Sequence, residues 1–264
     1  MVIVSVFRAL QSPLCALTVR IALSVAMLAI LLAIAITAGR QLPPTPQIAY
    51  QSNRARSWDV FVVDVVRHLD VRMTFARAFD YSPAWSPDGT RVAFVSSRSG
   101  FYDIYMVDFV AHRTFLVKDD LSAETDPSWV DAQTLRYKVM GEVETGDYLY
   151  ELDLYSGNLQ FLGSVVPQAR EPVMSPDTTY AASLKIERGN LDIAVWSIQT
   201  TEEGRIAAHA TNENYPAWSS DSQWLAFASD RDGNWEIYIA SLDGARVERV
   251  THNRHQDILP SWHP

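Results

Sequence analysis

The chain has almost no cysteine, because Cys15 is the only one among its 264 residues. A single cysteine excludes any disulfide within the chain, so cysteine usage says nothing about the redox compartment. Pro13 and Leu14 stand before Cys15, and they are not the small residues that a lipid-attachment signal uses. The thiol therefore indicates neither a disulfide-stabilised fold nor a lipid anchor.

Motifs that carry catalytic chemistry are missing as well. The sequence contains no Gly-x-Ser-x-Gly nucleophile elbow, no His-Glu-x-x-His zinc helix and no glycine loop that would cradle phosphate. The segment 230–234 superficially resembles a calcium loop, but it lacks the full ligand series and the bidentate Glu. We therefore expect a protein that is not an enzyme and that holds no cofactor or metal.

Positive charge is scarce, with 22 Lys and Arg against 31 Asp and Glu and a net charge of -9. Residues 1–40 hold three of the arginines and no acid, which leaves about -12 on residues 41–264. Such an acidic body argues against nucleic acid and anionic lipid headgroups as partners of that region, and it favours basic partners or cations. The alternative is that the charge only keeps the body soluble.

Long apolar runs are missing except for one, in which all 18 residues from Ile21 to Ala38 are apolar or small Ser and Thr. This length is close to the ~20 residues of a membrane-spanning helix. Arg8 and Arg20 before the run, against Arg40 after it, favour a cytoplasmic N-terminus. We predict a cytoplasmic segment (1–20), a single transmembrane anchor (21–39), a proline-rich linker (40–46) and a periplasmic or extracellular body (47–264). A cleaved secretion signal is the alternative.

The body is built from one sequence unit that recurs along the chain. Two close copies and three weaker ones share a Pro-x-Trp or Pro-x-Met segment: Pro83–Trp85, Pro216–Trp218, Pro127–Trp129, Pro172–Met174 and Pro260–Trp262. Their Trp or Met residues stand at positions 85, 129, 174, 218 and 262, so they are spaced by 44, 45, 44 and 44 residues. A period of about 40–45 residues with short β-type segments is typical of propeller blades.

The two ends of the body are parts of one and the same unit, which is the fifth. The segment 47–74 matches the later strands of the repeat but lacks the Pro-x-Trp strand, and Ile258–Pro264 is that strand alone. We therefore predict an all-β propeller of about five four-stranded blades, closed by the C-terminal strand joining the N-terminal blade.

Within a unit, we expect ion pairs between the second and third strands, across the loop that connects them. The predicted cross-strand pairs are Arg98 with Asp103, Arg54 with Asp59, and Arg231 with Glu236. The third and fourth units depart from the repeat, the fourth having Met174 for Trp and Ala194 for the third-strand Tyr. Such variation fits a recognition site and unselected divergence equally well.

The segment Ser86–Gly89 and the strand at Ile104 and Tyr105 resemble the TolB-type propeller repeat, which also occurs in prolyl-oligopeptidase-like peptidases. The resemblance covers about residues 47–264 and implies that the Pro-x-Trp strand is the innermost of each blade. Only two residues follow Trp262, so we expect no hydrolase domain and no peptidase activity.

An acidic residue stands three positions before the proline in four units, and Ala169 is the exception. The acidic residues are Asp80, Glu124, Glu213 and Asp257. Around the mouth of a central channel they would bind a cation, a basic peptide or a polyhydroxylated ligand. Alternatively, each carboxylate accepts backbone N–H bonds from a neighbouring blade.

These observations predict a membrane-anchored, extracytoplasmic propeller that acts as a binding or scaffold module for a protein, peptide or glycan. The alternative is a propeller lyase or hydrolase that acts on a carbohydrate or lactone. It would use the channel-mouth carboxylates or a metal held by His252, His255 and His263.

Overall fold

The computed structural model describes residues 45–118, 122–141, 146–165, 172–187, 189–200, 203–205 and 209–264. The segments predicted as cytoplasmic (1–20) and transmembrane (21–39), and most of the linker, lie outside the described residues. Within these ranges no helix is long and apolar enough to cross a membrane. The body forms one compact unit from Pro46 to Pro264.

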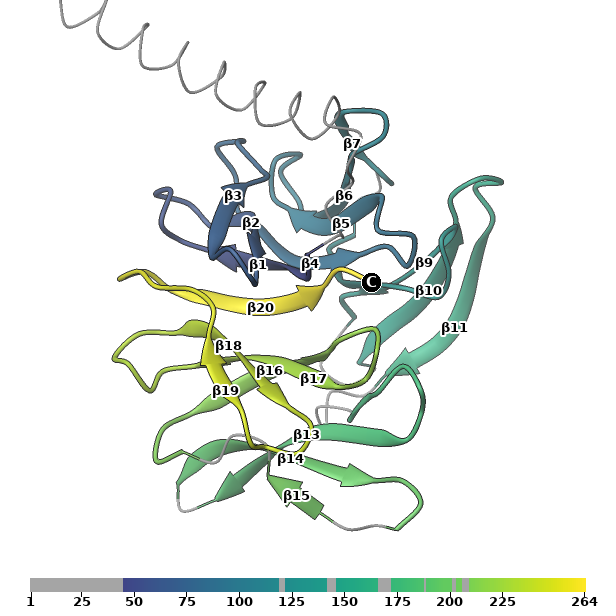
Figure 1. Cartoon of the computed structure of the whole chain (residues 1–264). Coiled ribbons are helices and arrows are strands. Elements are labelled where there is room, and N and C mark those ends of the chain that lie inside the picture. The colour runs from purple at the N-terminus through teal and green to yellow at the C-terminus, as the bar shows by residue number, and fades with distance from the viewer. Residues whose placement is uncertain are drawn as a thin grey trace, which may run out of the picture. The chain divides into compact units, whose positions relative to one another are not determined.

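Five four-stranded sheets make up this unit, and the predicted all-β propeller of five blades is confirmed. Figure 1 shows how the blades are arranged. The composite blade is β20 (Asp257–Trp262), β1 (Gln47–Ser52), β2 (Asp59–Asp64) and β3 (Leu69–Arg72). The second blade is β4 (Asp80–Trp85), β5 (Arg91–Ser96), β6 (Asp103–Asp108) and β7 (Arg113–Leu116). The third blade is β8 (Glu124–Trp129), β9 (Thr134–Val139), β10 (Asp147–Asp153) and β11 (Leu159–Val165).

The fourth blade is β12 (Val173–Met174), β13 (Tyr180–Glu187), β14 (Asn190–Ser197) and β15 (Glu203–Arg205). The fifth is β16 (Glu213–Trp218), β17 (Trp224–Ser229), β18 (Glu236–Ser241) and β19 (Val247–Arg249). The first strands of neighbouring blades contact one another, since β20 touches β4 and β16, and β4 touches β8. The first strand is therefore the innermost strand of each blade.

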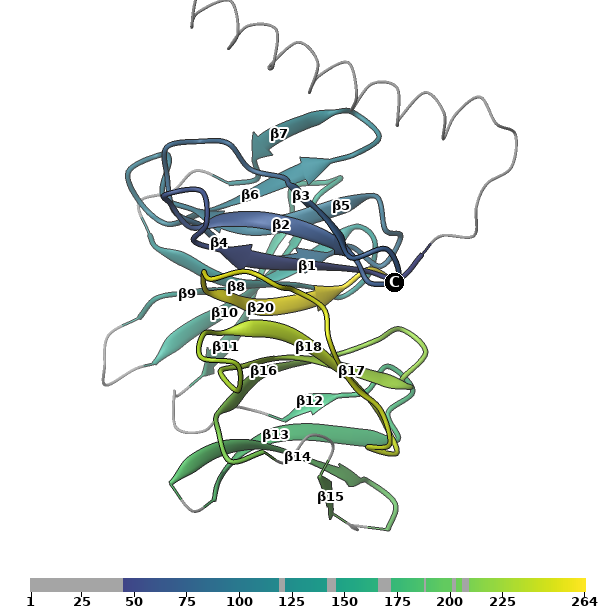
Figure 2. The same ribbon diagram turned by 60° about the vertical axis from the view of Figure 1, so that its left-hand side comes forward.

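The composite blade joins the two ends of the propeller. Strand β20 pairs antiparallel with β1, with Ile48 opposite Trp262 and Ser52 opposite Asp257. Figures 1 and 2 both show β20, in yellow, beside β1, in purple. A segment from the C-terminus thus supplies the strand that the sequence 47–74 lacks.

The turn after each innermost strand is built from its own side chains. In the second blade the Ser86 hydroxyl donates to Asp88 at 2.6 Å, and the Arg91 N–H donates to the same hydroxyl at 2.9 Å. Gly89 adopts a φ of 67°, which glycine reaches without strain. The Pro-Asp-Gly segment therefore forms the tight turn that its composition predicts.

Both faces of a blade are buried against its neighbours. Ile104 of β6 packs in a cluster with Leu135 of the third blade, whereas Val107 packs in a cluster with Val60 of the composite blade. Successive side chains of β6 therefore point to opposite neighbouring blades. This arrangement explains why β5 and β6 are almost continuously apolar, because neither face meets water.

Tryptophan side chains add a bond between blades. The indole N–H of Trp129, Trp218 and Trp262 donates to the carbonyl oxygen of Ala84, Val173 and Ala217, at 3.1, 2.9 and 3.0 Å. In each case the acceptor belongs to the innermost strand of the preceding blade. A residue that the sequence repeats for packing thus also links successive blades by hydrogen bonds.

Hydrophobic clusters join four neighbouring pairs of blades, and together they contain most of the described core. Among the described residues, no such cluster joins the third blade to the fourth. Met174 replaces the tryptophan at this boundary and has a 45% exposed side chain. We call the facing sides of the third and fourth blades the seam.

Candidate functional site

The four predicted acidic positions lie at the first residues of β4, β8, β16 and β20, and all four side chains are fully buried. The Arg98 guanidinium donates to both carboxylate oxygens of Asp80, at 3.1 and 3.0 Å. Arg231 donates to Glu213 at 3.0 Å. Each of these arginines follows the second strand of the same blade.

Glu124 and Asp257 are held differently. Glu124 accepts the backbone N–H of Ile104, from the preceding blade, at 3.1 Å, and the Lys118 ammonium lies 3.9 Å away. Asp257 accepts from the Asn253 amide at 2.6 Å. Backbone support from a neighbouring blade, the alternative role, is thus seen at Glu124, while ligand binding by the four carboxylates stays a prediction.

The predicted charge pairs across the second loop are wrong. Arg98 pairs with Asp80 on the innermost strand, and Arg54 pairs with Asp70 on the outermost strand at 2.5 Å. Glu236, the expected partner of Arg231, pairs with Arg249 at 2.9 Å. Both strands that neighbour the second strand of a blade carry acidic residues. The sequence spacing alone does not indicate which of these residues pairs with the arginine.

An aromatic pair decides where these cations lie. In four blades, neighbouring rings on the second and third strands lie 5.9 to 6.1 Å apart: Tyr50 and Phe61, Phe94 and Tyr105, Tyr137 and Tyr150, and Phe227 and Tyr238. A cation lies over each pair of rings. The guanidinium carbon of Arg54 lies 3.8 Å from the centre of the Phe61 ring, and that of Arg98 lies 4.5 Å from the centre of the Tyr105 ring. Cation–π contact with a desolvated ring is favourable, and the buried acid balances the charge.

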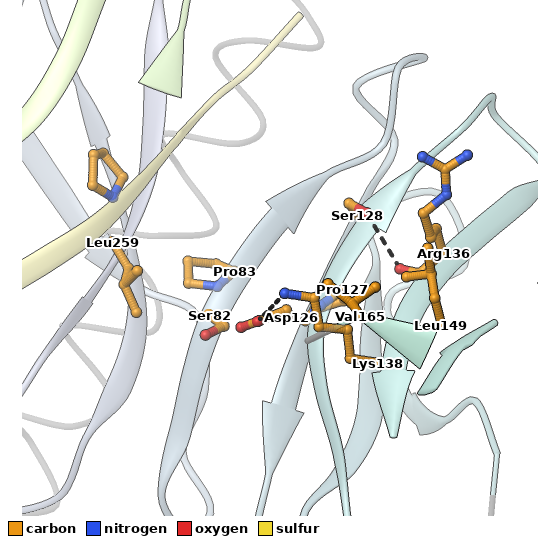
Figure 3. Close-up of a pocket in the computed structure, with 11 residues that line it drawn as sticks. Ser82, Pro83, Asp126, Pro127, Ser128, Arg136, Lys138, Leu149, Val165 and Leu259 are labelled. Atoms are coloured by element: carbon orange, nitrogen blue, oxygen red, sulfur yellow. Dashed lines mark hydrogen bonds and ion pairs between the residues drawn. The ribbon is translucent and has the colours of Figure 1, made fainter. Parts of the chain in front are cut away.

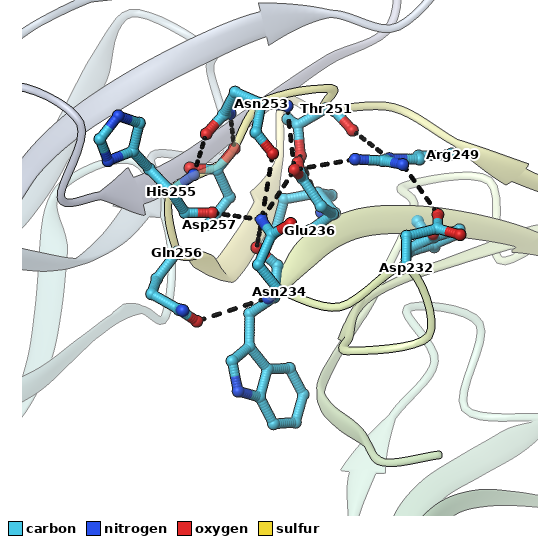
Figure 4. Close-up of polar contacts among 12 residues, drawn as sticks. Asp232, Asn234, Glu236, Arg249, Thr251, Asn253, His255, Gln256 and Asp257 are labelled. Atoms are coloured by element: carbon cyan, nitrogen blue, oxygen red, sulfur yellow. Dashed lines mark hydrogen bonds and ion pairs between the residues drawn. The ribbon is translucent and has the colours of Figure 1, made fainter. Parts of the chain in front are cut away.

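Figure 4 shows the polar contacts at the junction of the fifth and composite blades. The Glu236 carboxylate accepts bonds from Arg249 at 2.9 Å, from the Thr251 hydroxyl at 2.6 Å and from the Asn253 N–H at 2.9 Å. The Asn253 side chain then donates to Asp257. Asn253 therefore connects two fully buried carboxylates from adjacent blades.

Two of the buried carboxylates have raised pKa values. Burial raises the pKa of Glu213 to about 8, the Arg231 guanidinium lowers it in part, and Asp192 raises it again through its charge and a side-chain hydrogen bond. Burial likewise raises the pKa of Asp257 to about 6, although bonds from Ser52 and Asn253 oppose the shift. At neutral pH, Glu213 therefore keeps its proton.

The fourth blade lacks the whole set of stabilising residues. Ser183 and Ala194, paired across β13 and β14, occupy the positions of the aromatic pair. Met174 stands in the position of the tryptophan, and Ala169, at the acidic position, lies outside the described residues. On the side that faces the third blade, the fourth blade therefore has small residues at the positions of the aromatic pair, whereas Trp196, opposite Ala181, shares that side.

The opposite wall of the seam carries charge where the other blades are apolar. Strand register aligns Arg136 with an alanine in each of the four other blades: Ala49, Ala93, Ala182 and Ala226. Glu151, opposite Arg136, aligns with four buried apolar residues: Val62, Met106, Val195 and Ile239. Lys138 extends this row of charges two residues beyond Arg136.

A pocket of about 440 Å³ opens along this charged wall (Figure 3). Its described lining comes from the second, third and composite blades: Ser82, Pro83, Asp126, Pro127, Ser128, Arg136, Lys138, Leu149, Val165, Leu259 and Pro260. A second pocket of about 450 Å³ shares Asp126, Leu259 and Pro260 and continues to the fourth and fifth blades. We call the two pockets together the seam cleft.

Bulges in the innermost strands shape the cleft. Ser82, Asp126, Tyr215 and Leu259 each precede the repeat proline and have φ values of 49° to 57°. The pairing register shifts at the same places, which marks a β-bulge in each strand. The bulges turn these side chains toward the centre, where all four line the cleft.

The three histidines of the enzymatic alternative are found in separate contacts. The ring of His263 lies 4.7 Å from that of Trp85, and the ring of His252 lies 5.9 Å from that of His68. His255 donates its backbone N–H to Asn253. Within the part of the chain that the structure describes, no group of three His, Cys, Asp or Glu residues is placed to hold a metal ion.

A family model described as the TolB beta propeller domain matches residues 131–264, which is half of the chain. The chain belongs to the TolB beta-propeller family. The resemblance of the repeat to that of TolB is thereby confirmed.

Parts of the chain are similar in sequence to curated proteins of other bacteria. It is 28% identical to Protein TolB homolog of Chlorobium chlorochromatii over 116 residues, which cover 44% of this chain and 26% of that protein. It is 29% identical to Uncharacterized peptidase YuxL of Bacillus subtilis over 108 residues, covering 38% and 16%. The chain thus spans less than half the length of these curated relatives.

Solved structures share the fold. TolB from Acinetobacter baumannii superposes with a TM-score of 0.50 at 15% identity, covering 90% of this chain and 71% of that one. Hydrazine synthase of Kuenenia stuttgartiensis gives a TM-score of 0.55 at 12% identity, with coverages of 83% and 46%. At such low identity these likenesses show the propeller architecture alone.

Proposed function

We propose that this TolB-family propeller is a membrane-anchored, extracytoplasmic module that binds a protein, peptide or glycan in the seam cleft. The apolar run at 21–38 and the arginines around it support the anchor and its orientation. The family supports a binding role, since a propeller scaffold carries function in sites added to it.

The cleft is the observation that carries the binding role. Elsewhere an apolar face of one blade packs against the next blade, whereas here Arg136, Lys138 and Glu151 lie on the side that faces the fourth blade, where Ser183 and Ala194 replace the aromatic pair. A concave pocket with convergent polar groups on a rigid scaffold is the usual form of a ligand site. The channel-mouth carboxylates belong to the supporting scaffold in this proposal, because all four are buried.

Filling the cleft tests the proposal. Ser183→Phe restores an aromatic side chain at a position where other blades have Phe94 and Phe227, and it would occupy the space opposite the charged wall. The full chain in detergent is screened against displayed random peptides and a glycan array. We expect enriched ligands to bind Ser183→Phe at least tenfold more weakly than the native chain.

A matched control adds the same ring elsewhere. Val66→Phe lies in an exposed turn, where the native side chain is 64% exposed, and should leave binding unchanged. Equal binding by the native chain and Ser183→Phe would reject the cleft as the site. An enzymatic role is the alternative, and a retained metal together with turnover would distinguish it.

A further inference from the structure

Arg136 has hydrogen-bonding capacity left for a ligand. Its Nε–H and one Nη2–H both donate to the same oxygen of Glu151, at 3.1 and 2.6 Å. Among the described residues these are the hydrogen bonds that Arg136 makes, so its Nη1 donors are not used. The side chain is 43% exposed and lines the pocket.

Lys138 provides a second cation on the same wall. Its ammonium lies 3.2 Å from Asp126, whose side chain is 59% exposed, and both residues line the pocket. An exposed ion pair of this kind contributes only about 0–1 kcal/mol, so a ligand carboxylate can replace Asp126 at little cost. The described charged lining of this pocket is therefore two cations and one exchangeable anion.

From this arrangement we infer that the seam cleft binds a peptide through an Asp or Glu side chain whose carboxylate pairs with Arg136, with Lys138 nearby. This inference rests on the proposed binding function and names its ligand. A guanidinium receives a carboxylate through two parallel N–H bonds, which gives both strength and orientation. The proline and aliphatic lining suits the methylene groups of such a side chain.

The charge of the protein favours this ligand at this place. The body carries about -12, so its surface repels acidic peptides in general. In the cleft, Arg136 and Lys138 balance Glu151 and Asp126, so this patch is locally neutral and repels an acidic peptide less than the rest of the body does. A basic ligand would need neither Arg136 nor Lys138.

The test uses the full chain in detergent and a capped penta-glutamate peptide, with binding followed by fluorescence anisotropy. We expect saturable binding by the native chain and a roughly 10- to 100-fold loss in Arg136→Ala, the effect of losing a hydrogen-bonded charge pair. Arg113→Ala is the control, because it removes one positive charge from the exposed strand β7, outside the cleft. Its affinity should stay within about twofold of native.

The variant should fold, because alanine occupies the aligned position in the four other blades. Should the unpaired Glu151 destabilise it, Arg136→Ala combined with Glu151→Met reproduces the pair Ala93 and Met106 of the second blade. The far-ultraviolet spectrum and melting temperature of each variant confirm the fold. The double variant must also lose penta-glutamate binding.

Three results would overturn the inference: no saturable binding of penta-glutamate, equal losses in Arg136→Ala and Arg113→Ala, or binding of penta-lysine in its place. Penta-lysine binding that Ser183→Phe abolishes would leave the cleft as a binding site and reject only its preference for carboxylates. If Ser183→Phe binds the enriched ligands as the native chain does, the proposed function itself fails.

Discussion

Replacing Glu213 by glutamine should make the stability of the propeller less dependent on pH. The Glu213 carboxyl is fully buried beside Asp192 and accepts a bond from Arg231 at 3.0 Å. Two carboxyl groups and one guanidinium form a neutral group when one proton is kept. Burial is the main reason why the pKa of Glu213 rises to about 8.

The sign of the effect follows from proton binding. The unfolded chain releases this proton near its ordinary pKa of 4.5, whereas the folded chain keeps it until about 8. Between these values the folded state binds more protons, so the free energy of unfolding falls as pH rises. The full shift corresponds to about 5 kcal/mol, and local relaxation and hydration should reduce the loss to about 2–4 kcal/mol.

The assay is urea unfolding followed by tryptophan fluorescence at pH values from 5 to 9. The free energy of unfolding of Glu213→Gln, minus that of the native chain, should grow from near zero at pH 5 to about 2–4 kcal/mol at pH 9. Asp257, whose pKa is also raised, is present in both chains and cancels in the difference. Glu248→Gln, at a half-exposed acid on β19, should show no such growth. A pH-independent difference for Glu213→Gln would refute the raised pKa of Glu213.

Three further changes test how the blades are joined. Trp262→Phe loses the indole bond to Ala217 and should cost about 0.5–1.5 kcal/mol more in urea unfolding than Trp85→Phe, whose indole nitrogen has no partner within the described residues. Equal costs would contradict the role of this bond. Deleting residues 258–264 should lower the melting temperature by more than about 10 °C if the strand closes the ring, and a shift of a degree or two would refute closure. Met174→Trp should add a link across the seam, raising stability by about 1 kcal/mol and weakening penta-glutamate binding; unchanged stability would show that the seam does not close.

The blade architecture could be predicted from the sequence because every blade repeats the same local chemistry. The Pro-x-Trp strand and its turn recur at a fixed spacing, and the missing strand of 47–74 is found at Asp257–Trp262. The position of the four acids also follows from that spacing. The ion-pair partners of the arginines do not follow from the spacing. Arg98 follows strand β5, which lies between strands that both carry an acidic residue, and the contact with the Tyr105 ring determines which way the Arg98 side chain points.

The seam cleft could not be recognised until strand register aligned the blades. In the sequence, Ser183 and Ala194 look like unrelated substitutions, and Arg136 looks like one surface charge among many. Paired strands place the first two at the positions of a buried aromatic pair, and they place Arg136 at a buried alanine position on the facing wall. The signal was the coincidence of these changes on two sides of one boundary.

That coincidence is the strongest reason to regard the seam as functional. A buried aromatic ring covers about 150–250 Å², so losing the pair at Ser183 and Ala194 removes several kcal/mol of burial. The charged side chains of Arg136 and Glu151 on the facing side of the third blade cannot replace this lost stabilisation by apolar packing. Natural proteins depart from consistent packing mainly at functional or strained sites, and they compensate for the lost stability elsewhere. Chance divergence would account for small replacements such as Ser183 and Ala194, but it does not account for an oriented guanidinium in a pocket, whose Nη1 donors have no partner among the described residues.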